Sequence, residues 1–384
     1  MELSPEDALR LNVLLANAEA VRIDENNMTI YGLNDGQEMK FPLTPSGRSD
    51  QYLKLVRATL SAAVLDSPGG YPLFLRRWTR MGQIDHEQMD RLLRLGEPEA
   101  VMAVVCSRNL SDELARRAWW CAPWSEHARR MLESKQVVAG EMGKKLAAHL
   151  IEHLPFETEP RDMLDTVRLV LQPGLIDEEQ KQRLWQSGAR NRSYRIGFLE
   201  TLPDALPEQQ PPRADAEQYR EVLSQLAVDG NPFAYQLQRL LSAAGQSFLT
   251  VAEDVLLHPA DQEAAIALFN TIGSYFSQLP HTEGLLDIAA IEKQAERMLQ
   301  ENSQLRLLLK AIPVLESEIR AMLILSHVSE YLLNPVFSQT DAVGTVMQER
   351  MLPVTTPLQQ SICRLRGKKA TMVTKSRGRG RRVQ

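Results

Sequence analysis

The feature that most constrains the fold is a succession of short amphipathic segments between residues 73 and 202. Within each segment apolar residues recur at intervals of three and four, which is the spacing of one helix face. Breaks of two to five residues, many with proline or glycine, separate the segments. Helices of about ten residues with such short connections favour antiparallel packing of chain neighbours. The pattern predicts an irregular helical array of the HEAT kind, although the sequence has no strict repeat period.

The regions on either side of this array have different patterns. Ser4-Pro5-Glu6-Asp7 is a helix-start signal, and alternating apolar residues around Glu25-Asn26-Asn27 predict a β-hairpin. Longer helical stripes beyond residue 215 predict a bundle of five or six helices. The expected fold class is therefore mainly α, with a small α+β unit at the N-terminus. The expected domains are this α+β unit at 1–65, the helical array at 66–205, a proline-rich linker at 206–214, the helical bundle at 215–349 and a basic, disordered tail at 350–384.

Charge is distributed unevenly along the chain. The net charge is −5, yet no acidic residue follows Glu349, whereas ten Lys and Arg residues do. Nine of these lie in residues 364–384, so residues 1–363 carry a net charge of −14. Such a tail could neutralise nucleic-acid phosphates, bind an acidic protein surface or remain solvated. It has no aromatic residue on which bases would stack.

The sequence favours a cytoplasmic location. No run of about 18 apolar residues occurs, so neither a membrane-spanning helix nor membrane association is expected. The first residues are acidic, and Arg10 and Asn12 interrupt the apolar residues that follow, unlike a secretory signal. Cys106, Cys121 and Cys363 are too few and too widely spaced for a disulfide framework. We expect these three thiols to be reduced.

One motif resembles a metal site. His149-Leu150-Ile151-Glu152-His153 matches the H-x-x-E-H pattern, in which two imidazoles one helical turn apart bind zinc and the glutamate activates water. A third ligand would have to come from beyond the proline-rich segment, for example Glu217 or Glu221. The alternative is a helix end, because histidines there complement the helix dipole and Pro155 follows at once. The second interpretation is favoured, and no metal or other cofactor is expected.

A second motif contains a cysteine among tryptophans. Trp119-Trp120-Cys121-Ala122-Pro123-Trp124 resembles the W-C-x-P-C redox pattern, but Trp124 stands where the resolving cysteine should be. Dithiol exchange through this motif is therefore excluded. A single reactive thiol remains a candidate, because a helix start and His127 could lower the pKa of Cys121. The alternative is that these side chains pack between helices.

Several stretches resemble one known family. They are SPEDALRLNVLLA, SPGGYPLFLRRWTRMGQ, LGEPEAVMAVV, LSDELARRAWW and LVLQPGLIDEEQ. Together, over residues 3–206, they resemble the S protein family encoded in the dissimilatory sulfite reductase (dsr) gene cluster of sulfur-oxidising bacteria. The resemblance implies a soluble cytoplasmic accessory protein of sulfur oxidation and carries over no catalytic residues.

Three functions follow as expectations. The first is a non-enzymatic accessory or regulatory protein of cytoplasmic sulfur oxidation that acts through contacts with other proteins of sulfur metabolism. The second is a thiol-dependent enzyme or sulfur carrier that uses Cys121. The third is association with nucleic acid through the basic C-terminal tail.

Overall fold

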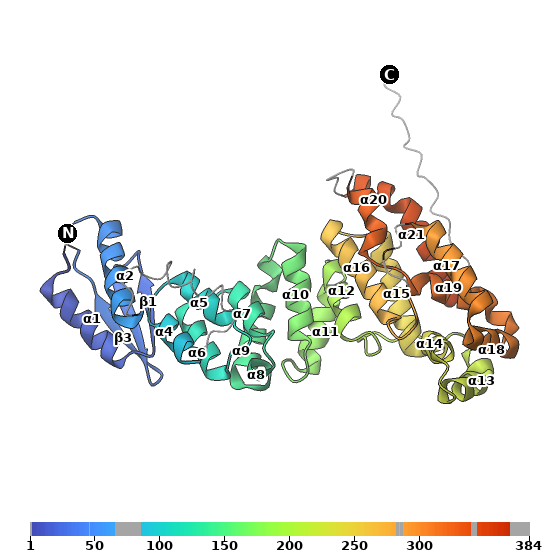
Figure 1. Ribbon diagram of the computed structural model, residues 1–384, viewed down its shortest axis with the longest axis horizontal. Helices are drawn as coiled ribbons and strands as arrows, with labels where there is room; N and C mark the ends of the chain where they lie inside the picture. The colour runs from blue at the N-terminus through green and yellow to red at the C-terminus, as the bar shows by residue number, and fades with distance from the viewer. Residues whose placement is uncertain are drawn as a thin grey trace, which may run out of the picture. The chain divides into compact units, whose positions relative to one another are not determined.

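The computed structural model describes residues 2–45, 47–65, 86–281, 284, 287–338 and 344–368 of the 384-residue chain. In these residues the protein is mainly α-helical, with one three-stranded antiparallel sheet near the N-terminus (Figure 1). This confirms the mainly-α class and the small α+β unit. The chain divides into two compact units: unit 1 is Met1–Phe156 with Gln172–Asp177, and unit 2 is Glu157–Leu171 with Glu178–Gln384.

Unit 1 opens with the α+β part. Its elements are α1 (Pro5–Asn17), β1 (Ala20–Asp24), β2 (Thr29–Asn34), β3 (Gln37–Pro42) and α2 (Ser49–Leu65). Ser4 caps α1, because its side chain accepts a hydrogen bond from the main-chain N–H of Asp7. The strands form a meander in the order β1-β2-β3, and the predicted β1–β2 hairpin is present. Their inner faces and the two helices share one apolar core that includes Leu14, Ile30 and Tyr52.

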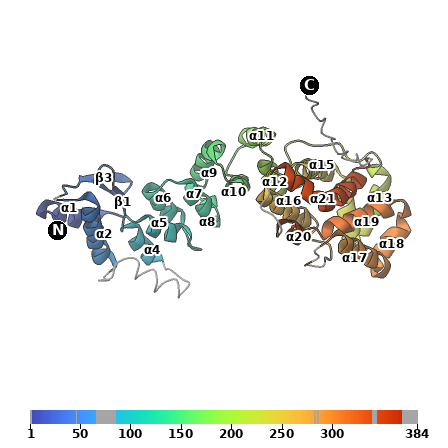
Figure 2. The same cartoon turned by 90° about the horizontal axis from the view of Figure 1, so that it is seen from above.

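The rest of unit 1 is a run of short helices. They are α4 (His86–Leu93), α5 (Pro98–Val105), α6 (Asp112–Cys121), α7 (Ser125–Met131), α8 (Lys135–Ala139), α9 (Glu141–His153) and the 3₁₀ turn η1 (Leu154–Phe156). Each packs on helices near it in the chain, as α4 does on α5 and α7 on α9 (Figure 2). Short connections thus place successive helices side by side, as the spacing of the breaks predicts.

A close approach at Gly140 fixes the junction of α8 and α9. The Asp112 carboxylate accepts 3.0 Å hydrogen bonds from the main-chain N–H groups of Glu141 and Met142, at the start of α9. A Cβ added at Gly140 would lie 2.2 Å from this carboxylate. Only glycine therefore leaves room for Asp112 to bind these two N–H groups.

We expect Gly140→Ala to lower the free energy of unfolding by about 1–2 kcal/mol, the usual cost of losing a helix cap. Urea unfolding of the full chain measures this. An Asp112→Ala background provides the control, because there the added methyl has no carboxylate to displace. Fully additive losses for the two substitutions would contradict the steric explanation.

Unit 2 is entirely helical in the described residues. Its helices are α10 (Pro160–Val170), α11 (Glu178–Ser187), α12 (Arg192–Thr201), α13 (Ala216–Val228), α14 (Pro232–Leu241), α15 (Ala243–Leu257), α16 (Gln262–Tyr275), α17 (Ile288–Glu301), α18 (Ser303–Ala311), α19 (Glu316–Ser326), α20 (Asn334–Phe337) and α21 (Thr345–Leu365), with 3₁₀ turns η2 (Pro313–Leu315) and η3 (Glu330–Leu333). Its core includes fully buried Phe233, Phe248 and Phe269. No single described helix is long and apolar enough to span a membrane; the bent pair α14 and α15 meets that test only when taken together.

The expected domain boundaries need correction at residues 206–214. These residues belong to unit 2, and the division between units falls near residue 156 instead. Leu206 is buried, the main-chain N–H of Gln210 donates to Ser247 Oγ at 2.7 Å, and that of Arg213 donates to the Leu241 carbonyl at 3.0 Å. Because of its prolines, this segment has no helical period, and in the sequence it therefore resembles a linker. Prolines do not, however, prevent a segment from packing on helices.

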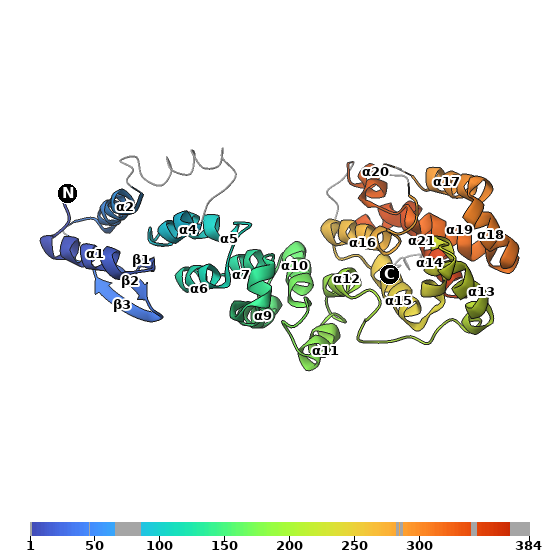
Figure 3. The same ribbon diagram turned by 60° about the horizontal axis from the view of Figure 1, so that its bottom comes forward.

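The expected disordered tail from residue 350 also needs correction. Helix α21 continues to Leu365 and packs beside α15 and α19 (Figure 3). Met351, Leu358, Ile362 and Leu365 are buried on its inner face, although Pro353 and Pro357 interrupt its main-chain hydrogen bonds. Burial of this apolar face thus outweighs the local signals of charge and proline. The remaining tail, residues 369–384, lies outside the described residues.

Candidate functional site

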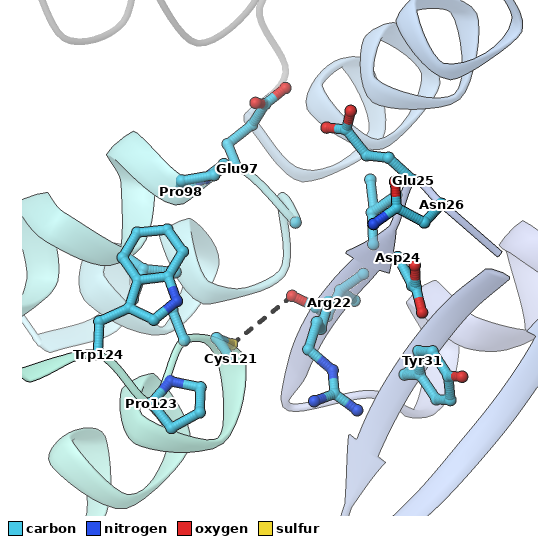
Figure 4. Close-up of a pocket in the computed structure, with 15 residues that line it drawn as sticks. Arg22, Asp24, Glu25, Asn26, Tyr31, Glu97, Pro98, Cys121, Pro123 and Trp124 are labelled. Atoms are coloured by element: carbon cyan, nitrogen blue, oxygen red, sulfur yellow. Dashed lines mark hydrogen bonds between the residues drawn. The ribbon is translucent and has the colours of Figure 1, made fainter. Parts of the chain in front are cut away.

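Unit 1 contains a cleft of about 550 Å³ between the edge of its sheet and its helices (Figure 4). Residues 21–26 of β1 and the following turn line one side, with Tyr31 from β2. Residues 96–98 and 121–124 line the other side, at the start of α5 and at the α6–α7 junction, together with Val101. The cleft therefore lies where the α+β part of unit 1 meets its helices.

The sheet side of the cleft is the free edge of β1. Strand β2 pairs with β1 on one side, and no described strand pairs with it on the other. The Val21 carbonyl points to this free side and accepts a hydrogen bond from Cys121 Sγ at 3.6 Å. Main-chain groups alternate in direction along an antiparallel strand, so those of Ile23 point to the same side as those of Val21. Gly96 permits close packing here, because a Cβ on it would lie 2.9 Å from Ile23 Cγ1.

The helix side of the cleft presents an indole. Trp124 precedes α7 and has half of its surface (51%) exposed. Its ring stacks on His127, with 5.0 Å between ring centroids. His127 is fully buried, and its Nδ1 donates to the Ala122 carbonyl at 2.9 Å. The buried imidazole thus fixes the turn on which Trp124 is presented.

The cleft has an acidic lining. Asp24, Glu25 and Glu97 contribute carboxylates, whereas Arg22 is the only cation among the described residues that line it. Arg22 pairs with Glu38 at 3.0 Å and lies over the Tyr31 ring. Three carboxylates against Arg22, which pairs with Glu38, give the described part of the lining a net negative charge.

The carboxylates differ in their surroundings. Hydrogen bonds from Asn27 lower the pKa of Asp24, which favours its ionised form. Burial raises the pKa of Glu97, and the nearby Arg57 offsets this only in part. Arg57 extends from α2 and forms ion pairs with both Glu25 (2.5 Å) and Glu97 (3.3 Å). One guanidinium therefore pairs with two carboxylates that line the cleft.

Cys121 lies at the base of the cleft as a buried thiol. Burial raises its pKa to about 12, which is opposite to the change that a helix start and His127 would produce. His127 directs its Nδ1 to Ala122, and no hydrogen bond joins its ring to Cys121 among the described contacts. The thiol instead donates to Val21, so this geometry holds β1 against α6 and opposes formation of a thiolate.

The buried Cys121 and the exposed Cys106 are expected to differ in their reaction with a thiol label. At pH 8 a thiol with a pKa near 12 has roughly 10⁻⁴ of its population as thiolate. We expect iodoacetamide to modify the exposed Cys106 in the folded protein and to modify Cys121 only after denaturation. Mass spectrometry of the labelled peptides measures both. Labelling of Cys121 as fast as Cys106 in the folded protein would contradict the buried, protonated thiol.

The two histidines of the H-x-x-E-H motif contact each other and neighbouring protein groups. The rings of His149 and His153 stack with centroids 3.9 Å apart, and His153 Nδ1 donates to the His149 carbonyl at 2.9 Å. His149 Nε2 lies 3.4 Å from Ser125 Oγ, and its ring packs edge-on against Trp119. Burial and the nearby His153 lower the pKa of His149. These contacts engage one ring nitrogen of each histidine, Nε2 of His149 and Nδ1 of His153, with protein groups.

The other proposed ligands do not complete the motif. Glu152 is exposed on α9. Glu217 and Glu221 lie on α13 in unit 2, and Glu217 forms an ion pair with Arg220 at 2.6 Å. In the described part of the chain, no three His, Cys, Asp or Glu side chains are grouped so that they could hold a metal.

Sequence reasoning selected Cys121 and Trp124 but missed the acidic side of the cleft. Glu25 and Glu97 are separated by 72 positions, and no local motif links them. Comparisons of the chain with protein-family models, curated proteins and solved structures found no match. The geometry of the cleft is therefore the basis of the functional proposal.

Proposed function

We propose that the protein is a non-enzymatic accessory or regulatory protein that binds another protein through the cleft of unit 1. The observation that carries this proposal is the half-exposed Trp124, fixed by His127 beside a cleft with polar groups. An aromatic side chain held rigidly within a polar rim is typical of the residues that dominate protein–protein binding energy. The buried, protonated Cys121 argues against a thiol enzyme or sulfur carrier at this position.

The partner that we propose is a protein of cytoplasmic sulfur oxidation. The support for this pathway is the resemblance of residues 3–206 to the S protein family of the dissimilatory sulfite reductase gene cluster. That region includes every residue that lines the cleft. A partner from the same pathway would therefore contact the part of the chain that carries the resemblance.

Affinity capture from sulfur-oxidising cells tests the proposal. We expect the full-length protein to retain proteins of sulfur oxidation and Trp124→Ala to retain them more than tenfold less, as for a central interface aromatic. Phe156→Ala is the matched control, because this aromatic residue is also in unit 1, is 80% exposed and lies outside the cleft.

Two results would overturn the proposal. One is recovery of no sulfur-oxidation protein with the unaltered chain. The other is equal recovery with both variants, which would place the contact elsewhere on the protein. Salt-sensitive DNA or RNA binding that disappears on deletion of residues 369–384 would support the nucleic-acid function instead.

A further inference from the structure

The two outer edges of the sheet differ in their protection. Along the free edge of β3, Glu38 and Lys40 carry charged side chains, and Pro42 ends the strand. Charged residues and proline are the usual means by which edge strands avoid pairing with other chains. Strand β1 also has two charged residues, Arg22 and Asp24, but it contains no proline, and its free edge faces the cleft. The edge with the better capacity to pair is therefore the one inside the cleft.

The free edge offers specific main-chain groups. The Val21 carbonyl already accepts from Cys121, whereas no hydrogen bond involves the N–H and carbonyl groups of Ile23 on this side among the described contacts. An extended chain that lies along β1 would pair with these groups, as peptides do when they add a strand to a sheet edge. The cleft follows β1 from Val21 through the turn at Asn26, which is long enough for several residues of such a chain.

The charge of the cleft and the indole of Trp124 indicate which side chains the added peptide would carry. Asp24, Glu25 and Glu97 attract positive side chains, because in the described part of the chain the single guanidinium of Arg57 pairs with both Glu25 and Glu97. Trp124 presents an exposed ring at the same cleft, and arginine or lysine binds favourably over an indole face. Both features favour a basic segment, and neither favours an acidic one.

We propose that the cleft binds an extended, basic peptide segment of a partner protein, which adds a strand to the free edge of β1 and places an arginine or lysine between Trp124 and the carboxylates of Glu25 and Glu97. This proposal rests on the proposed function and specifies the chemistry of the partner. It predicts both a side-chain preference and a main-chain pattern, which can be measured separately.

Selection from a phage-displayed library of random linear peptides on the immobilised full-length protein tests the side-chain preference. We expect selected peptides to be enriched in arginine and lysine, with β-branched residues at alternate positions. A synthetic peptide of the selected sequence should bind Trp124→Ala and Glu97→Gln at least tenfold more weakly than the unaltered protein. Phe156→Ala should bind it equally well, as an exposed aromatic outside the cleft.

Peptides that are N-methylated at one main-chain amide at a time test strand addition. Only alternate amides of an added strand face β1, so methylation should weaken binding at every second position and have little effect at the others. Loss at every position or at none would overturn strand addition. Selection of acidic or uncharged peptides, of no consensus, or of peptides that bind Trp124→Ala equally well would overturn the proposed occupant.

One further variant separates a partner from the protein's own tail. Deletion of residues 369–384 should leave the peptide affinity unchanged; a tenfold increase would show that the basic tail occupies the cleft, and would overturn binding of a partner segment. The outcome is also distinct from that of the capture experiment. If capture of sulfur-oxidation proteins depends on Trp124 but no basic peptides are selected, only the peptide inference is overturned. If basic peptides are selected and bind through Trp124 but no sulfur-oxidation protein is captured, only the role in sulfur oxidation is overturned.

Discussion

Replacing Arg213 by alanine is expected to lower the free energy of unfolding of unit 2 by about 3 kcal/mol, as for loss of one partner from a buried ion pair. The Arg213 side chain is 5% exposed. Its guanidinium donates to both carboxylate oxygens of Asp215, at 2.6 and 2.7 Å, and to Glu318 at 3.0 Å. Burial alone would lower the pKa of Arg213, but these two carboxylates outweigh it and raise the pKa. The substitution would leave Glu318 without its charged partner in a largely buried position.

Hydrogen exchange measured by mass spectrometry can resolve this loss by unit. Amides of unit 2 should exchange faster in Arg213→Ala, whereas those of unit 1 should not change. Arg220→Ala is the matched control, because Arg220 is 67% exposed and its pair with Glu217 should contribute less than about 0.5 kcal/mol. Equal effects of the two substitutions would mean that residues 206–214 are held only loosely.

The second large effect is expected at Asp7 in unit 1. This carboxylate is fully buried and accepts hydrogen bonds from Tyr52 Oη at 2.5 Å and from the Thr44 N–H at 2.9 Å, while Arg10 lies 3.2 Å away. Asp7→Ala would leave the Tyr52 hydroxyl and the Thr44 amide without this acceptor. We expect the free energy of unfolding to fall by about 3 kcal/mol. Asp50→Ala, at a 74% exposed pair with Arg48, is the control and should change it by less than about 0.5 kcal/mol.

The same carboxylate predicts a dependence on acid. Burial alone would raise the pKa of Asp7, but the hydrogen bonds from Tyr52 and Thr44 outweigh it and lower the pKa. Its contribution to stability is therefore complete above the ordinary carboxyl pKa of about 4 and is lost as the pH falls through the lowered value. Urea midpoints measured across this range should fall more steeply for the unaltered protein than for Asp7→Ala. Parallel curves would contradict a role for the Asp7 charge.

The parts of the fold that the sequence predicted correctly depend on local signals. The start of α1 follows from Ser4 and Pro5, and the first hairpin follows from polar turn residues between alternating strands. The two corrected regions depend on distant contacts. Ile362 is buried on α21, which packs on the distant helices α15 and α19, and Leu206 is buried as well. Neither proline content nor charge predicts this burial. Buried apolar area can outweigh unfavourable local propensity, because tertiary packing supplies most of the stability of a helix.

The candidate site shows the same limit. Trp124 and Cys121 stand out because tryptophan and cysteine are rare, but the sequence does not reveal that one is half-exposed and the other buried. Glu25 and Glu97 come together only because β1 packs beside α4 and α6, with Arg57 paired to both carboxylates. The charge of the cleft is thus a product of tertiary packing and has no counterpart in any short motif.

The division into units has a consequence for how the chain can be cut. The polypeptide leaves unit 1 after Phe156, returns to it for Gln172–Asp177 and then completes unit 2. The returning segment is integral to unit 1, since Gln172 Nε2 donates to the Leu132 carbonyl at 2.9 Å and Leu175 is buried. Hydrolysis of any single peptide bond therefore leaves at least one fragment with parts of both units. The two units are separate in their packing but interleaved along the chain, so proteolysis cannot release either one intact by a single cleavage.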